Sequence, residues 1–485
     1  MKQIKLPEKY KNMPVQVRAS FWFLICSFLQ KGISVVTTPI FTRLLTTAEY
    51  GQYNVFNSWL GIITIFVSLH LSLGVFMQGM IKFSDDRKKY ASSLQGLSLT
   101  LTVFWTIIYL IFRDFWNGLF SLTTVQMLAM LVMIWATAAF TFWSTEQRVE
   151  YKYRNLVIAT LIVSLAKPLI GILFVIHAED KVTARILGLA LVELVGYTGF
   201  FVVQMIRGKQ FYSEQYWTHA LRFNIPLVPH YLSSTVLNSA DRIMIKNYAG
   251  ASDAGIYSLA YSISQIMILF NTALNQTLGP WIYQKIKDKK TRDIAGIAYL
   301  SLGIIAFVNL ALIAVAPEAV AVFAPPAYHD AIWMIPPVAM SVIFIFSYDL
   351  FAKFEFYFEK STWVMAASVL GAALNVGLNY LFIRHYGYYA AAYTTLICYI
   401  IYAAAHYFFM KKICSIYLDG VQVYDPKNLL LIYGTFILAG FALMLTYNYP
   451  LIRYSVIVVV ILIVISKRKL ILEQLKKIMA LRQKK

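Results

Sequence analysis

The sequence has little acid and almost no cysteine for its length. Its 485 residues include 23 Asp and Glu against 43 Lys and Arg, and charged residues make up only 14% of the chain. The three cysteines, Cys26, Cys398 and Cys414, form no CxxC pair and have no histidines at metal-ligand spacing. We therefore expect neither a disulfide framework nor a metal site.

Catalytic motifs are missing as well. The sequence contains no GxxxxGK[ST] phosphate loop, no HExxH motif and no GxSxG turn, and no paired acids stand out. We therefore expect no enzymatic activity, no catalytic residues and no ATP-driven step. The longest connection that carries few cations, 317–329, is too small to host chemistry on an external substrate, and we expect it to form proline-bearing turns.

Long apolar runs stand in place of these features. Hydrophobic residues make up 59% of the chain, and apolar stretches of about 18 to 25 residues recur along it, which is the length of a helix that crosses a bilayer. Transmembrane strands would instead alternate in segments of about ten residues. We predict an all-α polytopic membrane protein with about fourteen spanning helices. They lie near residues 19–42, 53–79, 94–112, 122–144, 157–177, 185–205, 223–247, 255–280, 294–316, 330–356, 362–383, 389–410, 429–446 and 454–466.

The basic residues predict the orientation of these helices, because segments rich in Lys and Arg stay in the cytoplasm. If the N-terminus is inside, the basic N-terminus 1–18, the tail 467–485 and most other cations fall on the cytoplasmic side. Both termini are then cytoplasmic. This topology, together with anionic membrane lipids that the amphipathic tail is expected to bind, explains the net charge of +20, so we do not expect nucleic acid as a partner.

The sequence also contains an internal repeat. At an offset of about 204 residues, TTAEYGQYNVF from Thr46 aligns with GASDAGIYSLA from Gly250, and at nearly the same offset EYKYRN from Glu150 aligns with EFYFEK from Glu355. Six predicted helices separate the two copies, so both copies run in the same direction through the membrane. The repeat therefore predicts two parallel halves with a cavity between them and transport by alternating access.

This repeat sets the expected domain organisation. We predict an N-terminal six-helix bundle over 19–206, a C-terminal six-helix bundle over 223–410 and two additional helices in 411–466. A pseudo-two-fold axis along the membrane normal is expected to relate the two bundles.

Several blocks of the sequence are similar to a known family. KGISVVTTPIFTRLL from Lys31, NSADRIMIKNYAGASDAG from Asn238, NQTLGPWIY from Asn275 and LNYLFIRHYGYYAAAYTTL from Leu378 resemble the polysaccharide-transport branch of the MOP exporter superfamily. These proteins are the bacterial flippases for lipid-linked O-antigen and capsule repeat units. The resemblance covers nearly the whole chain and implies a MATE/MOP-like fold with twelve plus two helices.

The resemblance also implies a function and a location. It implies that the protein moves an undecaprenyl-pyrophosphate-linked oligosaccharide to the outer leaflet of the bacterial cytoplasmic (inner) membrane, for O-antigen, capsule or exopolysaccharide synthesis. The polymerase and the chain-length regulator of the same pathway are candidate partners.

Cations inside the predicted spans are candidate substrate-binding residues, because an ionised side chain at membrane depth normally faces protein or a water-filled cavity. Lys31 lies near the middle of the first predicted helix, and we expect it either to meet the diphosphate or to pair with a carboxylate of a neighbouring helix. Arg242 and Lys246 are four residues apart and share one helix face. Arg43, near a helix end, is either a cavity cation or an interfacial anchor.

Other charged residues in the spans are candidates for a gate or for ion coupling. Asp241 is expected to pair with a cation of the facing half or to act in coupling. Asp349 and Lys353, four residues apart, are expected to form an ion pair, and an unpaired Asp349 would carry a coupling proton. Lys167 and Glu193 are comparable candidates. The sequence does not choose among them, nor between a proton and sodium as the coupling ion.

Aromatic residues are the remaining candidates. Tyr and Trp can stack on sugar faces and donate a hydrogen bond, although most aromatics of a membrane protein pack in the core or form the interface belts. Within the repeated and family-like blocks, the candidates for stacking are Tyr53, Tyr257, Tyr261 and Trp281.

Two other functions are weighed against the flippase. An ion-coupled exporter of drugs or small amphiphiles on the same fold would need carboxylates for cationic cargo, whereas the deep charges here are mainly basic. A polysaccharide polymerase or ligase would need larger outer loops than this sequence has.

Overall fold

The structure is a computed structural model that describes residues 15–469. Its regular elements are all helices within these residues. The chain divides into two compact units, Met1–Thr235 and Val236–Lys485, and each is described here by itself. The predicted boundary between the bundles lies in 207–222, whereas the division between the units falls inside a helix, α11 (Val228–Tyr248).

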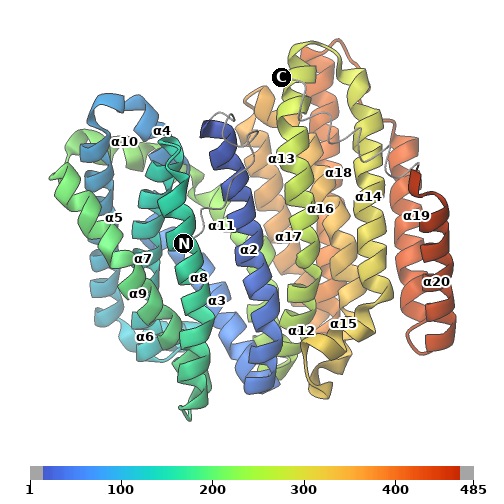
Figure 1. The fold of residues 1–485 in the computed structure, drawn as a ribbon, viewed down its shortest axis with the longest axis horizontal. Coiled ribbons are helices and arrows are strands. Elements are labelled where there is room, and N and C mark those ends of the chain that lie inside the picture. Colours follow the sequence, from blue (N-terminus) through green and yellow to red (C-terminus); the bar gives the residue numbers. More distant parts are fainter. Residues whose placement is uncertain (1–14, 470–485) are drawn as a thin grey trace, which may run out of the picture. The chain divides into compact units, whose positions relative to one another are not determined.

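Unit 1 contains the first six predicted spans (Figure 1). The helices in these spans are α2 (Val15–Leu44), α3 (Thr47–Ser68), α4 (Gly74–Lys82), α5 (Arg87–Ile111), α7 (Thr124–Val149), α8 (Tyr153–Ile176) and α9 (Lys181–Gly208). Two further helices, α6 (Arg113–Phe120) and α10 (Glu214–Asn224), connect spans. α9 packs against α5, α7 and α8 and is the central helix of the unit, while α2 packs on α8.

The second predicted span, 53–79, is not one helix. α3 ends at Ser68 and α4 begins at Gly74, and between them Leu69 and His70 have left-handed backbones with φ of 48° and 49°. The side-chain amide of Asn224, which is fully buried, donates to the Leu69 carbonyl over 2.7 Å. The prediction of a continuous helix is therefore wrong, because a buried side chain satisfies backbone groups that the helix leaves free.

Unit 2 contains the remaining spans (Figure 1). After α11 its helices are α12 (Ala251–Ser264), α13 (Ile266–Lys287), α14 (Ile294–Ala314), α15 (Ala316–Phe323), α16 (Ile335–Tyr357), α17 (Ser361–Tyr386), α18 (Tyr389–Tyr417), α19 (Pro426–Leu445) and α20 (Pro450–Ser466). α16 packs against α13, α14 and α18. In its most apolar 18-residue stretch 89% of the residues are buried, so α16 is the central helix of this unit.

Helix starts in the two units follow the internal repeat. α3 begins at Thr47, where the Thr46 hydroxyl accepts from the Glu49 backbone and the Glu49 carboxylate accepts from the Thr46 backbone, which is a capping box. α12 begins at Ala251, 204 residues later, with Asp253 in its first turn. A carboxylate in the first turn stabilises a helix because it satisfies or faces the free N–H groups there.

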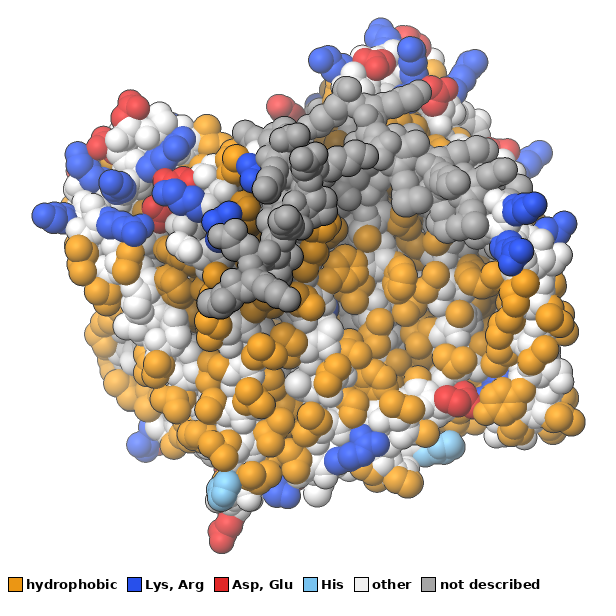
Figure 2. All heavy atoms as spheres, in the orientation of Figure 1, with side chains coloured by type: hydrophobic (Ala, Val, Ile, Leu, Met, Phe, Trp, Pro, Cys, Tyr) orange, Lys and Arg blue, Asp and Glu red, His pale blue; other side chains and the backbone are white. Residues whose placement is uncertain are grey.

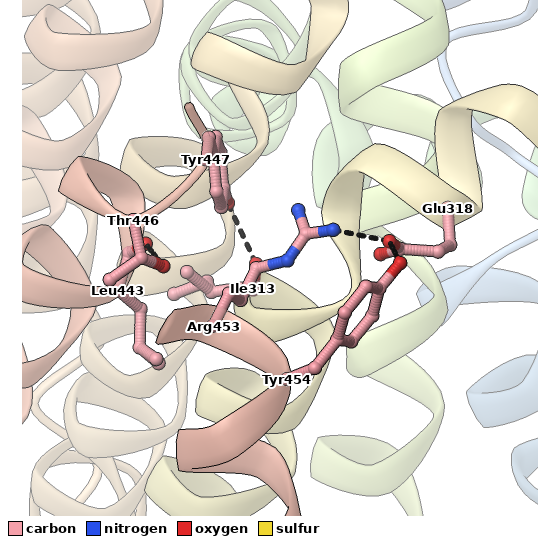
Figure 3. A network of polar contacts seen from close by, with 7 residues as sticks. All are labelled: Ile313, Glu318, Leu443, Thr446, Tyr447, Arg453 and Tyr454. Atoms are coloured by element: carbon pink, nitrogen blue, oxygen red, sulfur yellow. Dashed lines mark hydrogen bonds and ion pairs between the residues drawn. The ribbon is translucent and has the colours of Figure 1, made fainter. Parts of the chain in front are cut away.

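A polar network connects the two additional helices, α19 and α20, to the rest of unit 2 (Figure 3). The buried Arg453 pairs with Glu318 of α15, and the Tyr454 hydroxyl donates to the same carboxylate. The Tyr447 hydroxyl donates to the Ile313 carbonyl over 2.7 Å. The predicted turns of 317–329 thus contain α15 and a 3₁₀ segment, Pro326–Trp333, and they anchor the end of α20.

The composition of the surface fits a membrane. Ten helices of the described residues are long and apolar enough to cross a bilayer, and the three cysteines are free and buried. Figure 2 shows hydrophobic side chains around the middle of the helices and most of the visible Lys and Arg side chains near one end of them. Four predicted spans are not among the ten. The spans 53–79, 223–247 and 255–280 are broken or rich in polar residues, and the helix of the span 454–466, α20, is shorter than the ten.

Candidate functional site

Asp241 in unit 2 is the centre of a buried polar cluster. Its side chain lies on α11 and is 1% exposed. The Tyr257 hydroxyl of α12 donates to Oδ2 over 2.7 Å, and the Thr395 hydroxyl of α18 donates to the same oxygen over 2.9 Å. Asn379 of α17 donates its amide to Oδ1 over 2.5 Å. Four helices of one unit therefore converge on this carboxylate.

This cluster bears on two predictions. Asp241 forms no ion pair among the described residues, and neutral hydroxyl and amide groups occupy its oxygens. Its pairing with a cation of the facing half as a gate stays a prediction, because each unit is described by itself. Tyr257 is fully buried, so neither face of its ring is open to a sugar in this conformation. It serves instead as a hydrogen-bond donor to Asp241.

A second polar site of unit 2 is a cavity of about 450 Å³ beside Asp349. Asn238, Asn271 and Asn275 line it together with Tyr348 and Asp349. The Asn275 amide donates to the Asp349 carboxylate over 2.7 Å, and the amide oxygens of Asn271 and Asn275 are buried without a hydrogen-bond partner among the described residues. Buried polar atoms without a partner are costly, so this cavity is suited to water or a polar ligand.

The expected ion pair between Asp349 and Lys353 does not form. No contact within ion-pair distance joins the two side chains, and Asn275 holds the carboxylate instead. A spacing of four residues places two side chains on one helix face, but a donor from a neighbouring helix, α13, competes for the same oxygen. The prediction of the ion pair is therefore wrong.

The two cations of α11 have no carboxylate partner among the described residues. The Arg242 guanidinium donates to the Asn238 carbonyl over 3.0 Å and lies 4.2 Å from the centre of the Tyr261 ring. Lys246, one turn further along the helix, is half-buried and forms no ion pair within residues 15–469. Because Arg242 covers a face of Tyr261, which is itself buried, the structure corrects the prediction that this ring is open to a sugar.

Lys31 in unit 1 lies on a polar stripe of α2. Ser27, Lys31, Ser34 and Thr38 are three or four residues apart and share one helix face, and the first three are exposed. The neighbouring face of α2 packs on α8, where the Gln30 amide donates to the Ser164 hydroxyl over 3.1 Å.

The exposed apolar face of the same helix is separate from this stripe. It includes Leu29, Val36 and Ile40, and Val36 is 66% exposed. On a helix of 3.6 residues per turn, Lys31 points about 160° away from the centre of these three residues. No described residue forms an ion pair with Lys31. The expected pairing of Lys31 with a carboxylate of a neighbouring helix is therefore not seen.

Lys167 and Glu193, predicted as separate candidates, form one ion pair in unit 1. The Lys167 Nζ atom of α8 lies 2.6 Å from a carboxylate oxygen of Glu193 on α9, whose side chain is 6% exposed. The Thr137 hydroxyl donates to the other oxygen over 3.1 Å. Glu193 also lines a cavity of about 200 Å³ beside the break between α3 and α4, together with His70.

Tyr53 and Arg43 lie near one end of unit 1. The Arg185 guanidinium of α9 lies 3.5 Å from the centre of the Tyr53 ring and 3.6 Å from that of the Phe41 ring. Arg185 therefore covers one face of the half-buried Tyr53 ring, and sugar stacking on this residue stays a prediction. Arg43 is exposed at the end of α2 and donates to the Pro39 carbonyl of its own helix over 2.9 Å. Trp281 of α13 is half-buried, with Lys285 5.9 Å from its ring centre.

The structure adds residues that the sequence reading missed. The amides of Asn375 and Asn379, four residues apart on α17, extend the Asp241 cluster. Glu355 and His406 are both fully buried, and the His406 Nδ1 atom lies 2.6 Å from the Glu355 carboxylate. Pairs of Asn at a spacing of four in apolar helices were a visible signal of a shared polar face.

Comparison with solved structures defines the class of protein. The lipid II flippase MurJ in an inward closed conformation has a TM-score of 0.68 and 14% identity to this protein, over 92% of this chain and 99% of that chain. A multidrug resistance MATE family transporter of the MOP superfamily, in an inward-facing conformation, has a TM-score of 0.62 and 15% identity, over 80% of this chain and 95% of that chain. The protein thus has the fold of MOP superfamily transporters, as the sequence predicts.

Sequence comparison identifies the family. The profile of the polysaccharide biosynthesis protein family matches residues 17–286, which is more than half of the chain. An uncharacterized membrane protein of Haemophilus influenzae is 21% identical over 384 residues, or 74% of this chain and 89% of that relative. The chain therefore belongs to the polysaccharide biosynthesis protein family, as the resemblance to polysaccharide transporters led us to expect.

Proposed function

We propose that the protein is a flippase that moves an undecaprenyl-pyrophosphate-linked oligosaccharide across the bacterial cytoplasmic membrane by alternating access through a cationic cavity. Its product would supply the synthesis of O-antigen, capsule or exopolysaccharide. The family and the fold support a transport role in polysaccharide synthesis. The choice of an acidic lipid-linked sugar rests on the charges inside the spans.

Physical chemistry explains why such a substrate needs a protein. Each sugar hydroxyl costs about 4 to 8 kcal/mol to place in hydrocarbon without a hydrogen-bond partner, and the diphosphate adds buried charge. Unaided crossing is therefore negligibly slow. A carrier must offer polar groups for the sugar and positive charge for the diphosphate, while the polyprenyl chain stays in lipid.

The distribution of partners among the intramembrane charges carries the proposal. Lys31, Arg242 and Lys246 have no carboxylate partner among the described residues. Each carboxylate deep in a span, by contrast, is bound to at least one protein group. These carboxylates are Glu146, Glu193, Asp241, Asp349 and Glu355. The positive charge that remains available is suited to an anionic headgroup and unsuited to cationic drugs.

Coupling to a proton or sodium stays a prediction, and unit 2 offers the better candidates for it. Asp241 and Asp349 are held by neutral donors, so each could take up a cation without breaking an ion pair. Glu193 is already paired with Lys167. We therefore propose Asp241 or Asp349 as the coupling group.

A sidedness assay in vesicles tests the proposal. The full-length protein is reconstituted, and three labelled cargoes are added to one leaflet: a polyprenyl-diphosphate oligosaccharide, the same oligosaccharide on an uncharged lipid, and a cationic amphiphile. A membrane-impermeant oxidant then reports which cargo has crossed. We expect only the diphosphate-linked cargo to cross, with a rate that responds to a proton or sodium gradient. Crossing of the cationic amphiphile alone would favour the drug exporter.

A cellular measurement separates the flippase from a polymerase or ligase. Loss of a flippase leaves single lipid-linked repeat units on the inner leaflet, whereas loss of a polymerase leaves them on the outer leaflet. We propose that both termini lie in the cytoplasm and that the polymerase and chain-length regulator act on the product. Repeat units stranded on the outer leaflet of a deletion strain would contradict the proposal.

A further inference from the structure

A cavity of about 750 Å³ lies at one end of unit 1, between the end of α4 and the helix α10. Lys82 and Phe83 line it from the α4 side, and His219 and Arg222 line it from α10. Its size is within the range of cavities that bind small ligands. Figure 2 shows Lys and Arg side chains gathered at the end of unit 1 that carries α10 in Figure 1.

α10 forms a fixed wall of this cavity. Its buried face contains Tyr216, Ala220 and Asn224, which are four residues apart. The Trp217 indole donates to the Ser93 carbonyl over 3.0 Å, and Asn224 donates to the backbone of Leu69. The opposite face of the helix is polar and faces the cavity. The cavity is therefore built by packing and hydrogen bonds within unit 1.

The charges in the cavity are mainly positive. Lys82 and Arg222 are exposed, and neither forms an ion pair among the described residues, while Glu214 is the carboxylate that lines the cavity. The His219 ring packs 5.3 Å from Phe83, and its Nδ1 atom is buried without a hydrogen-bond partner in the described chain. Burial, and then the nearby Lys82, lower the pKa of His219, so at pH 7 it is a neutral group that can donate or accept one hydrogen bond.

An apolar track leads directly to these cations. Leu73, just before α4, and Met77 and Ile81 of α4 are four residues apart and exposed, and Ile81 is 62% exposed next to Lys82. Three exposed apolar side chains on one helix face next to a basic cavity match the two parts of a phospholipid. A free anion would have no use for the apolar track.

We propose that this cavity binds the phosphate headgroup of an anionic phospholipid, with an acyl chain along the apolar track of α4. Lys82 and Arg222 bind the phosphate oxygens from opposite walls, and the Arg222 guanidinium suits two of these oxygens at once. His219 supplies a further hydrogen bond. The lipid bridges α4 and α10, and so it ties the connection between spans six and seven to the break in the second span.

Native mass spectrometry of the full-length protein with phosphatidylglycerol tests this site. We expect one molecule of phosphatidylglycerol to stay bound, and its affinity to fall at least about tenfold in the double variant Lys82→Gln, Arg222→Gln. The matched control is Lys88→Gln, Arg207→Gln, which removes one Lys and one Arg from the same end of unit 1, where both are exposed but outside the cavity. Glu214→Gln is expected to tighten binding several-fold, because it removes the carboxylate from the cavity.

Three outcomes would overturn the proposal. The first is equal loss of affinity in the test and control variants, which would indicate general attraction of a basic surface. The second is binding of phosphatidylcholine with the same affinity as phosphatidylglycerol. The third is competition by inorganic phosphate at concentrations similar to those of the lipid, which would indicate a site for the anion alone. A thermal melt of each variant confirms that it is folded, because all four substituted cations are exposed.

Discussion

The carboxylate of Glu193 in unit 1 and those of Asp241 and Asp349 in unit 2 are held in different ways. In unit 1 the deep carboxylate of Glu193 is neutralised by Lys167 at 2.6 Å. In unit 2 the carboxylates of Asp241 and Asp349 are held by hydroxyl and amide groups. A carboxylate held by neutral donors can take up a proton or a metal ion, whereas a paired carboxylate already has its counterion.

We propose that these carboxylates and the available cations have separate roles. The cluster around Asp241 in unit 2 is suited to ion coupling, while the cations Arg242 and Lys246 of the same helix remain available for an anion. In unit 1 the corresponding available cation is Lys31, on the polar stripe of α2.

The largest effect is expected for Asp241→Leu. This substitution leaves the donors of Tyr257, Thr395 and Asn379 buried without an acceptor, at a cost of about 4 kcal/mol or more in the free energy of unfolding. A thermal melt of the detergent-solubilised protein measures the loss. The control Asp114→Leu changes an exposed carboxylate. Equal melting temperatures for the two variants would show that the Asp241 cluster is not structural.

Lys167→Met should destabilise unit 1 by about 3 kcal/mol, because it leaves the buried Glu193 without its counterion. The double variant Lys167→Met, Glu193→Gln removes both charges and should recover most of the loss. Melting temperatures of the single and double variants measure this recovery. Additive losses would contradict the comparison, because they would mean that the two charges do not depend on each other.

A smaller contrast is expected for two glycines. A Cβ atom at Gly208 in unit 1 would meet the Lys88 carbonyl at 2.1 Å, and the backbone there cannot easily move. At Gly440 in unit 2 it would meet the Met340 sulfur at 2.7 Å, and a Met side chain can change rotamer. We expect Gly208→Ala to cost about 2 kcal/mol and Gly440→Ala less than about 1 kcal/mol. A lower melting temperature for Gly440→Ala than for Gly208→Ala would contradict this prediction.

The sequence was sufficient to predict most of the fold. Apolar runs of bilayer length gave the spans, and the alignment of Thr46 with Gly250 gave the equivalent helix starts at Thr47 and Ala251. The break after Ser68 was not predictable from local signals, because neither Pro nor Gly stands at Leu69 or His70. Asn224, 155 residues away in sequence, stabilises that break.

The candidate site was predicted less completely, because partners of polar groups come from distant segments. The spacing of Asp349 and Lys353 predicted an ion pair, but Asn275 holds the carboxylate. Arg185, from a different helix, covers one face of the Tyr53 ring, and nothing in the local sequence around Tyr53 indicates this contact. Lys31 is exposed on the polar stripe of α2, and its role as a cavity cation stays a prediction.

The proposed flippase function depends most on Lys31 as a cation that binds the substrate. The sidedness assay with Lys31 variants therefore tests this function most directly. We expect Lys31→Ala to slow crossing of the diphosphate-linked oligosaccharide at least about tenfold, since a charge-assisted hydrogen bond contributes about 1.5 to 3 kcal/mol, and Lys31→Arg to retain most of the rate. The control variant Leu29→Ala, on the exposed apolar face of the same helix, should move the oligosaccharide at the wild-type rate. A wild-type rate in Lys31→Ala would contradict the account.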